Sequence, residues 1–165
     1  MILPAENLIE HFGSDSFDVV IATELIEHVR DWKLVVNNMK ELLKRGGRLY
    51  ITTRSYGFPF HGYPLDFWRC EVKDMQTIFS DFRILALQKD SHEPGVFLRA
   101  EKPDGHGPNN LEDVAIYSMI LGKRTLSMPD IHEMTLLRRL KLSAMRSIDR
   151  VSRRLFYSAI RRMGS

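Results

Sequence analysis

The 165-residue sequence predicts an α/β fold in which a parallel pair of strands is followed by an antiparallel pair. Residues Phe17–Thr23 and 48–53 are short apolar runs on either side of a stretch with helical spacing, 31–45. A strand, a helix and a strand in this order form a βαβ unit, whose crossover makes the two strands parallel. The apolar runs 82–88 and 95–100 are joined by a turn too short for a crossover, so this second pair must be antiparallel.

Each of these elements follows from a local pattern. Phe17–Thr23 is β-branched and continuously apolar, which is typical of a strand buried on both faces of a parallel sheet. In 31–45 apolar residues recur at helical spacing, and the Gly46-Gly47 pair is expected to end the helix. Further helices are expected at 72–79, at 111–121 and from about 130 to 162.

The composition is that of a soluble globular protein, with 44% hydrophobic and 27% charged residues. No apolar run approaches the roughly 18 residues that span a bilayer. The first residues lack the basic and then apolar layout of a secretory signal. The single cysteine, Cys70, excludes an internal disulfide and fits a reducing compartment, so we expect a cytoplasmic protein.

Positive charge is concentrated in the C-terminal tail. Residues 131–165 carry nine Lys and Arg against Glu133 and Asp149, a net charge of +7, which leaves −4 for the rest of the chain. Apolar residues recur there every three or four positions, so the predicted helix is amphipathic. Those residues are Leu137, Leu140, Ala144, Ile148, Val151 and Leu155.

Three kinds of partner suit such a helix. It can dock on its own domain or on a second copy, as a plain amphipathic helix does. It can also make a peripheral contact with an anionic membrane through its apolar side and its cations. Nucleic acid is the least favoured partner, because aromatic interleaving and recognition motifs are missing from the sequence.

Three segments, in order along the chain, resemble class I S-adenosylmethionine-dependent methyltransferases, in particular the branch loosely called type 11. Residues 17–29 resemble that family's fourth strand and the segment after it. Residues 42–53, which begin Leu-Leu-Lys-Arg-Gly-Gly, resemble its leucine-lysine-x-glycine-glycine turn and fifth strand, and 63–69 is similar to a segment of the type 11 branch. The resemblance implies a Rossmann-like half-sheet of parallel strands with an antiparallel C-terminal hairpin, followed by C-terminal helices.

The resemblance, which covers about residues 5–103, and the local patterns beyond it together give the expected domain organisation. Residues 1–103 correspond to a partial methyltransferase domain, 104–110 to a linker and 111–165 to a helical, basic C-terminal extension. The family's first three strands have no counterpart here. Its glycine-rich loop, which lets the backbone approach the cofactor, is also missing, since Gly13 is the sole glycine before Gly46. We therefore expect the chain alone to bind S-adenosylmethionine weakly or not at all, and to require a missing N-terminal half or a homo-oligomeric partner.

Two carboxylates and an imidazole follow the first predicted strand, where Glu24, Glu27 and His28 stand at i, i+3 and i+4. If the chain turns helically there, these side chains share one face and can bind Mg²⁺ or Mn²⁺. The same Glu-x-x-Glu-His sequence occurs in metal-dependent O-methyltransferases, and that resemblance implies His61 as a further ligand. In the alternative interpretation no metal is bound, His28 packs against the next helix, and Glu24 lies near the methionine end of the cofactor.

An aromatic loop, 55–69, follows the strand 48–53. Ligands of open α/β sheets bind at the carboxyl ends of parallel strands, and aromatic faces suit a sugar ring or another planar acceptor. Tyr56, Phe60 and Tyr63 are therefore predicted to contact the substrate.

The same loop also has a purely structural interpretation. Phe67 and Trp68 can anchor the core, and Asp66 with Arg69 can form an ion pair that fixes the loop. For Trp68 the structural role is the favoured one. Cys70 has no neighbouring histidine in the sequence and is expected to be a packed, inert thiol.

Together these features predict transfer of a methyl group from S-adenosylmethionine to an oxygen of a small-molecule or saccharide acceptor. His28 and His61 are the candidate catalytic bases, and Thr23 and Glu24 the candidate cofactor-binding residues. The alternative from another functional class is a non-catalytic methyltransferase-like fragment, an interaction module that docks through its basic amphipathic C-terminal helix.

Overall fold

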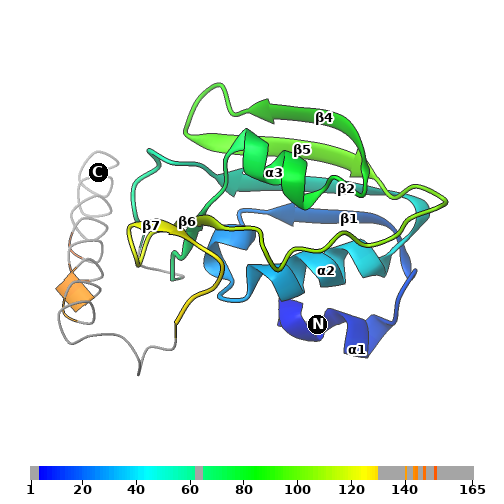
Figure 1. Ribbon diagram of the computed structural model, residues 1–165, viewed down its shortest axis with the longest axis horizontal. Helices are drawn as coiled ribbons and strands as arrows, with labels where there is room; N and C mark the ends of the chain where they lie inside the picture. Colours follow the sequence, from blue (N-terminus) through cyan, green and yellow to red (C-terminus); the bar gives the residue numbers. More distant parts are fainter. Residues whose placement is uncertain are drawn as a thin grey trace, which may run out of the picture.

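The computed structural model describes residues 4–61 and 65–129, together with the single positions 140, 143, 144, 147 and 151. Figure 1 shows a main sheet with helices against it and a smaller sheet near one end. The strand order is β1-β2-β5-β4 in the main sheet and β3-β6-β7 in the small one. The strands are β1 (Phe17–Thr23), β2 (Leu43–Arg54), β3 (Trp68–Arg69), β4 (Arg83–Lys89), β5 (Gly95–Glu101), β6 (Ile116–Ser118) and β7 (Lys123–Thr125). The helices are η1 (Ala5–Asn7), α1 (Leu8–Phe12), η2 (Ile26–His28), α2 (Trp32–Leu42) and α3 (Val72–Ile78).

β1 and β2 are adjacent and parallel, as the βαβ pattern predicts. Their register runs from Val19 opposite Arg48 to Thr23 opposite Thr52. β4 and β5 form the predicted antiparallel pair, and β5 also pairs antiparallel with β2. The Rossmann-like half-sheet with an antiparallel hairpin is therefore confirmed.

The hydrophobic core lies on one face of the main sheet. Alternate residues of β2 and β5 point into it, and none of these four is more than 3% exposed: Leu49, Ile51, Val96 and Leu98. They form one cluster with side chains of α2 and α3, including Val35, Met39, Met75 and Ile78. Both helices therefore cover the same face (Figure 1).

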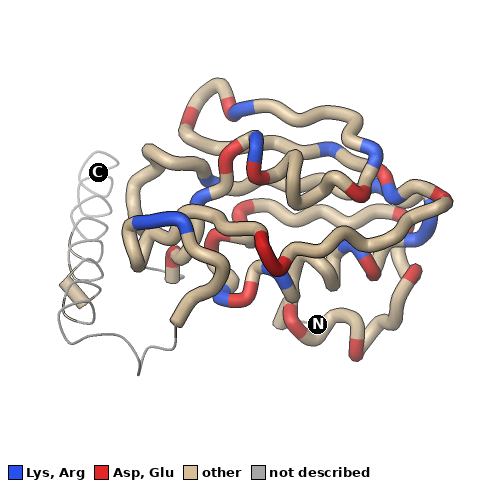
Figure 2. The backbone as a smooth tube through the Cα atoms, in the orientation of Figure 1, with Lys and Arg blue, Asp and Glu red and all other residues tan. Residues whose placement is uncertain are grey.

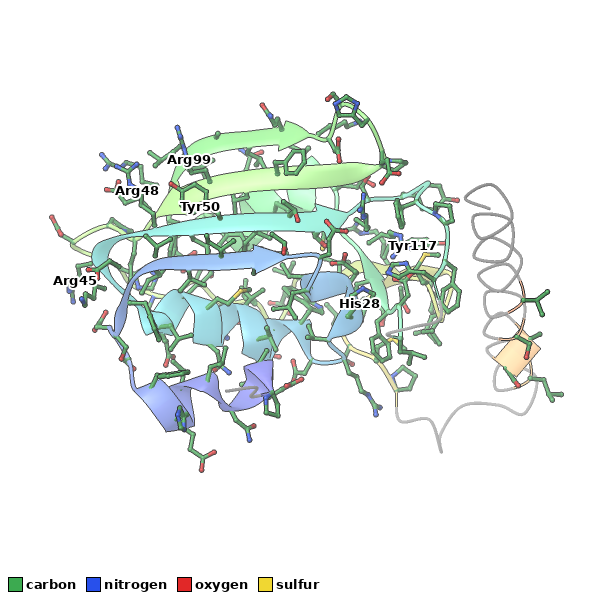
Figure 3. The ribbon with its side chains drawn as sticks, turned by 180° about the vertical axis from the view of Figure 1, so that it is seen from behind. His28, Arg45, Arg48, Tyr50, Arg99 and Tyr117 are labelled. Atoms are coloured by element: carbon green, nitrogen blue, oxygen red, sulfur yellow. The ribbon has the colours of Figure 1, made fainter. Side chains whose placement is uncertain are left out.

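The other face of the sheet, here called the open face, is formed by Val19 and Ile21 of β1, Tyr50 of β2, and Phe97 and Arg99 of β5. Ile21 is 68% exposed, Val19 49% and Phe97 38%. Tyr50 and Arg99 are register partners, and Figure 3 shows them close to Arg48. The expectation that β1 is buried on both faces is wrong, because no described residue covers the open face of the sheet.

α2 begins where the sequence predicts and ends earlier. The Asp31 carboxylate caps it by accepting a hydrogen bond from the backbone N–H of Leu34 at 3.1 Å. The helix stops at Leu42, and the chain enters β2 directly at Leu43. The glycines serve the strand instead: a Cβ at Gly47 would lie 2.7 Å from the carbonyl oxygen of Lys44 and 3.2 Å from that of Asp18.

The helix expected at 111–121 is wrong, because this segment supplies strand β6 and the turn to β7. Trp68 of β3 pairs with Ser118, which is fully buried, and Gly122 adopts a φ of +66° in the turn. Pairing with a strand far away in the sequence decides the structure here, over local helical spacing. The helix expected from about 130 to 162 lies outside the described residues except at five positions, all of which are helical.

The predicted linker 104–110 packs against the helical layer. The Lys40 ammonium is buried and donates to Asp81 at 2.7 Å and to the Asn109 side chain at 2.8 Å. His106 lies 3.0 Å from the other oxygen of Asp81. No helix among the described residues is long and apolar enough to cross a membrane.

Candidate functional site

The candidate site lies at the carboxyl ends of β1 and β2, here called the carboxyl edge. Thr23 ends β1, and Arg54 ends β2. Glu24 follows with a φ of +52°, a left-handed conformation that non-glycine residues adopt rarely. Such strained backbone is found preferentially at functional sites.

Glu24 faces the end of β2. Its carboxylate accepts a hydrogen bond from the Thr52 hydroxyl at 2.9 Å and pairs with the Arg54 guanidinium. Arg54 also pairs with Glu93 at 2.9 Å and lies over the ring of Phe58, 4.1 Å from its centroid. Because Glu24 is left-handed and the helical turn begins only at Ile26, the expected helical alignment of Glu24 with the two later residues is wrong.

Glu27 is fully buried behind Glu24. One carboxyl oxygen accepts a hydrogen bond from the Thr53 hydroxyl at 2.9 Å, and the other has no hydrogen-bond partner. Burial raises the pKa of Glu27 to about 7, and the neighbouring Glu24 charge raises it further against the lowering effect of the Thr53 bond. Near neutral pH both the protonated and the charged form of this carboxyl group are therefore populated.

The structure brings His28 and His61 together, with their Nε2 atoms 3.0 Å apart. Nδ1 of His28 lies 3.1 Å from the carbonyl oxygen of Leu65, which can only accept. Nδ1 of His28 therefore carries the proton when the ring is neutral, and its Nε2 accepts from His61. Figure 3 places His28 at the end of the sheet opposite Arg45.

The two histidines have pKa values shifted in opposite directions. Burial, and then the charge of His61, lowers the pKa of His28. The Asp66 carboxylate, 3.0 Å from Nδ1 of His61, raises the pKa of His61, although that N–H points out of line for a straight hydrogen bond. On protonation of the pair, the charge therefore resides on His61, and His28 keeps the free base form.

Asp66 is held by Arg69. Both are buried, and the guanidinium donates to the carboxylate at 2.5 and 2.6 Å. Burial raises the pKa of Asp66, but the bonds from Arg69 and His61 outweigh this and hold it below the ordinary value. Arg69 also donates to the carbonyl oxygens of Phe58 and Pro59, so it fixes the loop that carries His61. The predicted structural ion pair is confirmed.

Some side chains of the aromatic loop lie at the surface, and others lie in the core. Tyr56 is 66% exposed, and Phe60 is partly buried against the core. Trp68 is fully buried and donates from Nε1 to the carbonyl oxygen of Val29 at 2.9 Å, so its structural role is confirmed. Tyr63 lies outside the described residues.

Tyr117 of β6 is a candidate site residue that the sequence did not indicate. Its ring meets that of Tyr56 edge to face, with centroids 5.1 Å apart. Figure 3 places Tyr117 at the same end of the molecule as His28. Only the pairing of β6 with β3 brings it there, so no local pattern could have pointed to it.

The proposed metal ligands do not form a metal site as they are placed. Glu24 is engaged by Arg54, Glu27 by Thr53, and His28 by Leu65. Among the residues that the structure describes, no group of three or more His, Cys, Asp and Glu could hold a metal ion. The arrangement therefore gives the predicted Mg²⁺ or Mn²⁺ no support.

The residues present fit one end of the implied cofactor only. Thr23 is exposed and Glu24 half-exposed at the carboxyl edge, where they can meet an ammonium or carboxylate group. Gly13 ends α1 with a φ of +75°, and the nearest atom to a Cβ there is the Ser16 hydroxyl oxygen at 3.9 Å. It therefore forms no tight cradle for a nucleotide, and none of the described residues replaces one.

A family model described as a methyltransferase domain matches residues 5–95. The match covers more than half of the chain, which therefore belongs to this methyltransferase family. None of the curated proteins compared with the chain matches it.

Several solved structures are similar to the chain at low sequence identity, and one of those named here has a TM-score above 0.5. The [4+2]-cyclase SpnF has a TM-score of 0.51 and 16% identity over 64% of this chain and 56% of its own. TehB from Haemophilus influenzae has a TM-score of 0.48 and 16% identity over 62% of this chain and 40% of its own. CrArsM, an arsenic(III) S-adenosylmethionine methyltransferase from Chlamydomonas reinhardtii, has a TM-score of 0.46 and 17% identity over 67% of this chain and 46% of its own. The chain thus spans about half the length of the structures that it matches.

Proposed function

We propose that the chain is the acceptor-side part of an S-adenosylmethionine-dependent methyltransferase that methylates an oxygen of a small-molecule or saccharide acceptor. The observation that carries the proposal is the His28–His61 pair at the carboxyl edge, since it places an imidazole of lowered pKa beside one of raised pKa. When bound, S-adenosylmethionine supplies a methyl group on a positively charged sulfur, so the acceptor needs chiefly alignment and the loss of one proton.

His28 is the proton acceptor in this scheme. An acceptor hydroxyl takes the place of His61 at Nε2 of His28 and donates its proton there. His61, held by Asp66 and Arg69, is the second catalytic candidate. Exposed Tyr56, with Tyr117 against it, offers an aromatic wall for a ring-shaped acceptor.

Thr23 and Glu24 are the proposed contacts for the methionine end of the cofactor. Calorimetric titration of the chain with S-adenosylhomocysteine tests this assignment. A heat of binding that falls on Glu24→Ala supports the proposal. Absence of binding at millimolar ligand favours the rival function, a non-catalytic interaction module.

Replacement of the base gives the sharpest catalytic prediction. In the presence of a cofactor-binding half, His28→Asn should lower methyl transfer from tritiated S-adenosylmethionine to phenolic or hexose acceptors by roughly 10²- to 10⁴-fold, because general-base catalysis contributes about that much. His92→Asn, at an exposed loop position, is the matched control and should leave the rate unchanged. Equal rates for both variants would remove His28 from the mechanism.

The pH dependence of methyl transfer should also identify His28 as the base. Since the pKa of His28 lies below its ordinary value, the base form persists to a lower pH than for a free histidine, and activity is lost only as the pH falls through that lowered pKa. An acid limb centred at or above the ordinary histidine value would contradict the assignment.

A further inference from the structure

The last residue of β2, Arg54, contacts two carboxylates and an aromatic ring at the carboxyl edge. Its guanidinium pairs through Nε with Glu24 and through Nη1 with Glu93, the latter at 2.9 Å. Its central carbon lies 4.1 Å from the centroid of the Phe58 ring, and such stacking favours one orientation of the planar group. Glu93 and Phe58 therefore hold the guanidinium beside Glu24.

Both members of the Glu24–Arg54 pair keep unused hydrogen-bonding capacity. A guanidinium has five N–H donors, and in the described part of the chain nothing accepts a hydrogen bond from Nη2 of Arg54. A carboxylate accepts about four hydrogen bonds, and Glu24 receives them from the Thr52 hydroxyl and from Arg54. The side chains of Arg54 and Glu24 are 19% and 37% exposed, so a ligand can reach both.

These unused groups are complementary to the head of an α-amino acid. Such a head carries an ammonium and a carboxylate on one carbon atom, and the pair offers a carboxylate and a guanidinium side by side. Charge-assisted hydrogen bonds between such groups are about twice as strong as neutral ones. Figure 2 shows acidic and basic residues interleaved over the described body, so local pairs of this kind have to recognise an ionic ligand.

The pair also lies close to the candidate base. Burial lowers the pKa of His28, and the Glu24 charge is near enough to act against that shift. A ligand head bound by Glu24 and Arg54 is therefore held within reach of the group that is to accept the proton.

We propose that Arg54 binds the α-carboxylate at the methionine end of S-adenosylmethionine while Glu24 binds its ammonium group. The two side chains then act together as a clamp for an amino-acid zwitterion, and Phe58 and Glu93 position Arg54 within it. This inference rests on the proposed function, and it adds Arg54 to the cofactor-binding residues.

Calorimetric titration with two ligands that differ in one group tests the proposal. S-adenosylhomocysteine carries the α-carboxylate, whereas its decarboxylated analogue keeps the ammonium group alone. The native chain should bind S-adenosylhomocysteine more tightly by about tenfold or more, because a hydrogen bond to a charged group contributes at least about that factor.

Variants of two arginines on β2 assign the effect. Arg54→Met should weaken the binding of S-adenosylhomocysteine by about tenfold or more and leave the binding of the analogue no weaker, which also shows that the variant is folded. Arg48→Met is the matched control, because Arg48 lies earlier on the same strand and pairs with Glu101 at 3.8 Å. It should leave both affinities unchanged.

The possible failures are distinguishable. If the native chain binds the analogue as tightly as S-adenosylhomocysteine, or if Arg54→Met weakens both ligands equally, the clamp is overturned and the proposed function stands. If the native chain binds neither ligand at millimolar concentration, the proposed function is overturned together with the clamp.

Discussion

At the carboxyl edge, Glu27, Asp66 and Arg69 are at most 1% exposed, whereas on the open face of the same sheet Ile21 is 68% and Val19 49% exposed. The first region buries charge, and the second exposes apolar area. Each departs from the usual arrangement, in which charged groups face water and apolar groups lie inside.

The two regions differ in whether the described chain supplies them with charge partners and with cover. At the carboxyl edge Asp66 finds its counter-charge in Arg69, and Thr53 satisfies one oxygen of Glu27. On the open face no described residue covers Ile21 or Val19. Structural integrity should therefore depend on the buried charges and on the covered face, and hardly at all on the open face.

Removing one charge of the buried pair should have the largest effect on stability. Arg69→Ala leaves Asp66 buried without its partner and frees the loop carbonyls, at a cost of about 3–5 kcal/mol. Arg99→Ala, on the open face, is the control and should change stability by less than about 0.5 kcal/mol. Urea unfolding measures both, and similar losses would show that the carboxyl edge is no more integral than the open face.

Truncating one isoleucine on each face of the sheet compares the contribution of the two faces to stability. Ile51→Ala removes a side chain that is 1% exposed and should cost about 2–5 kcal/mol. Ile21→Ala acts on a side chain that is 68% exposed and should fall within about 0.5 kcal/mol. If thermal unfolding showed Ile21→Ala to be as costly as Ile51→Ala, the open face would be covered in solution.

The buried carboxyl group of Glu27 should make stability depend on pH. Its pKa is raised from 4.5 to about 7, so between these values the folded chain binds more protons than the unfolded chain. The free energy of unfolding should therefore fall as the pH rises from about 4.5 to 7, by a few kcal/mol at most.

Glu27→Gln should flatten that slope and leave the chain more stable than the native one above pH 7. Glu10→Gln, in exposed α1, is the control and should keep the native slope. A native slope in Glu27→Gln would assign the proton uptake to another group.

Local sequence patterns predicted both strand pairs of the main sheet, but not the β2–β5 pairing that joins them. The apolar run Phe17–Thr23, the capped helix after Asp31 and the β4–β5 pair depend on residues close together in the chain. The pattern failed where distant strands decide the outcome. Gly47 accommodates the backbone of Asp18 in β1, and β6 pairs with β3.

The sequence predicted that the two candidate histidines lie at one edge of the sheet, but not the geometry of the candidate site. The sequence placed His28 and His61 after adjacent parallel strands, and the structure brings them to 3.0 Å. The left-handed backbone of Glu24 could not be read from the sequence, and it turns this carboxylate to Arg54 and away from a shared metal. The position of Tyr117 depends on the long-range pairing of β6 with β3, so no local sequence pattern indicated it.

The central claim is that the methionine end of the cofactor meets the carboxyl edge. Titration of the isotopically labelled chain with S-adenosylhomocysteine, followed residue by residue in NMR spectra, tests it even when affinity is weak. We predict that the amide signals of Thr23, Glu24 and His28 shift together and saturate. Saturable shifts confined to the open face, around Tyr50 and Phe97, or no shifts at all at millimolar ligand, would contradict the account.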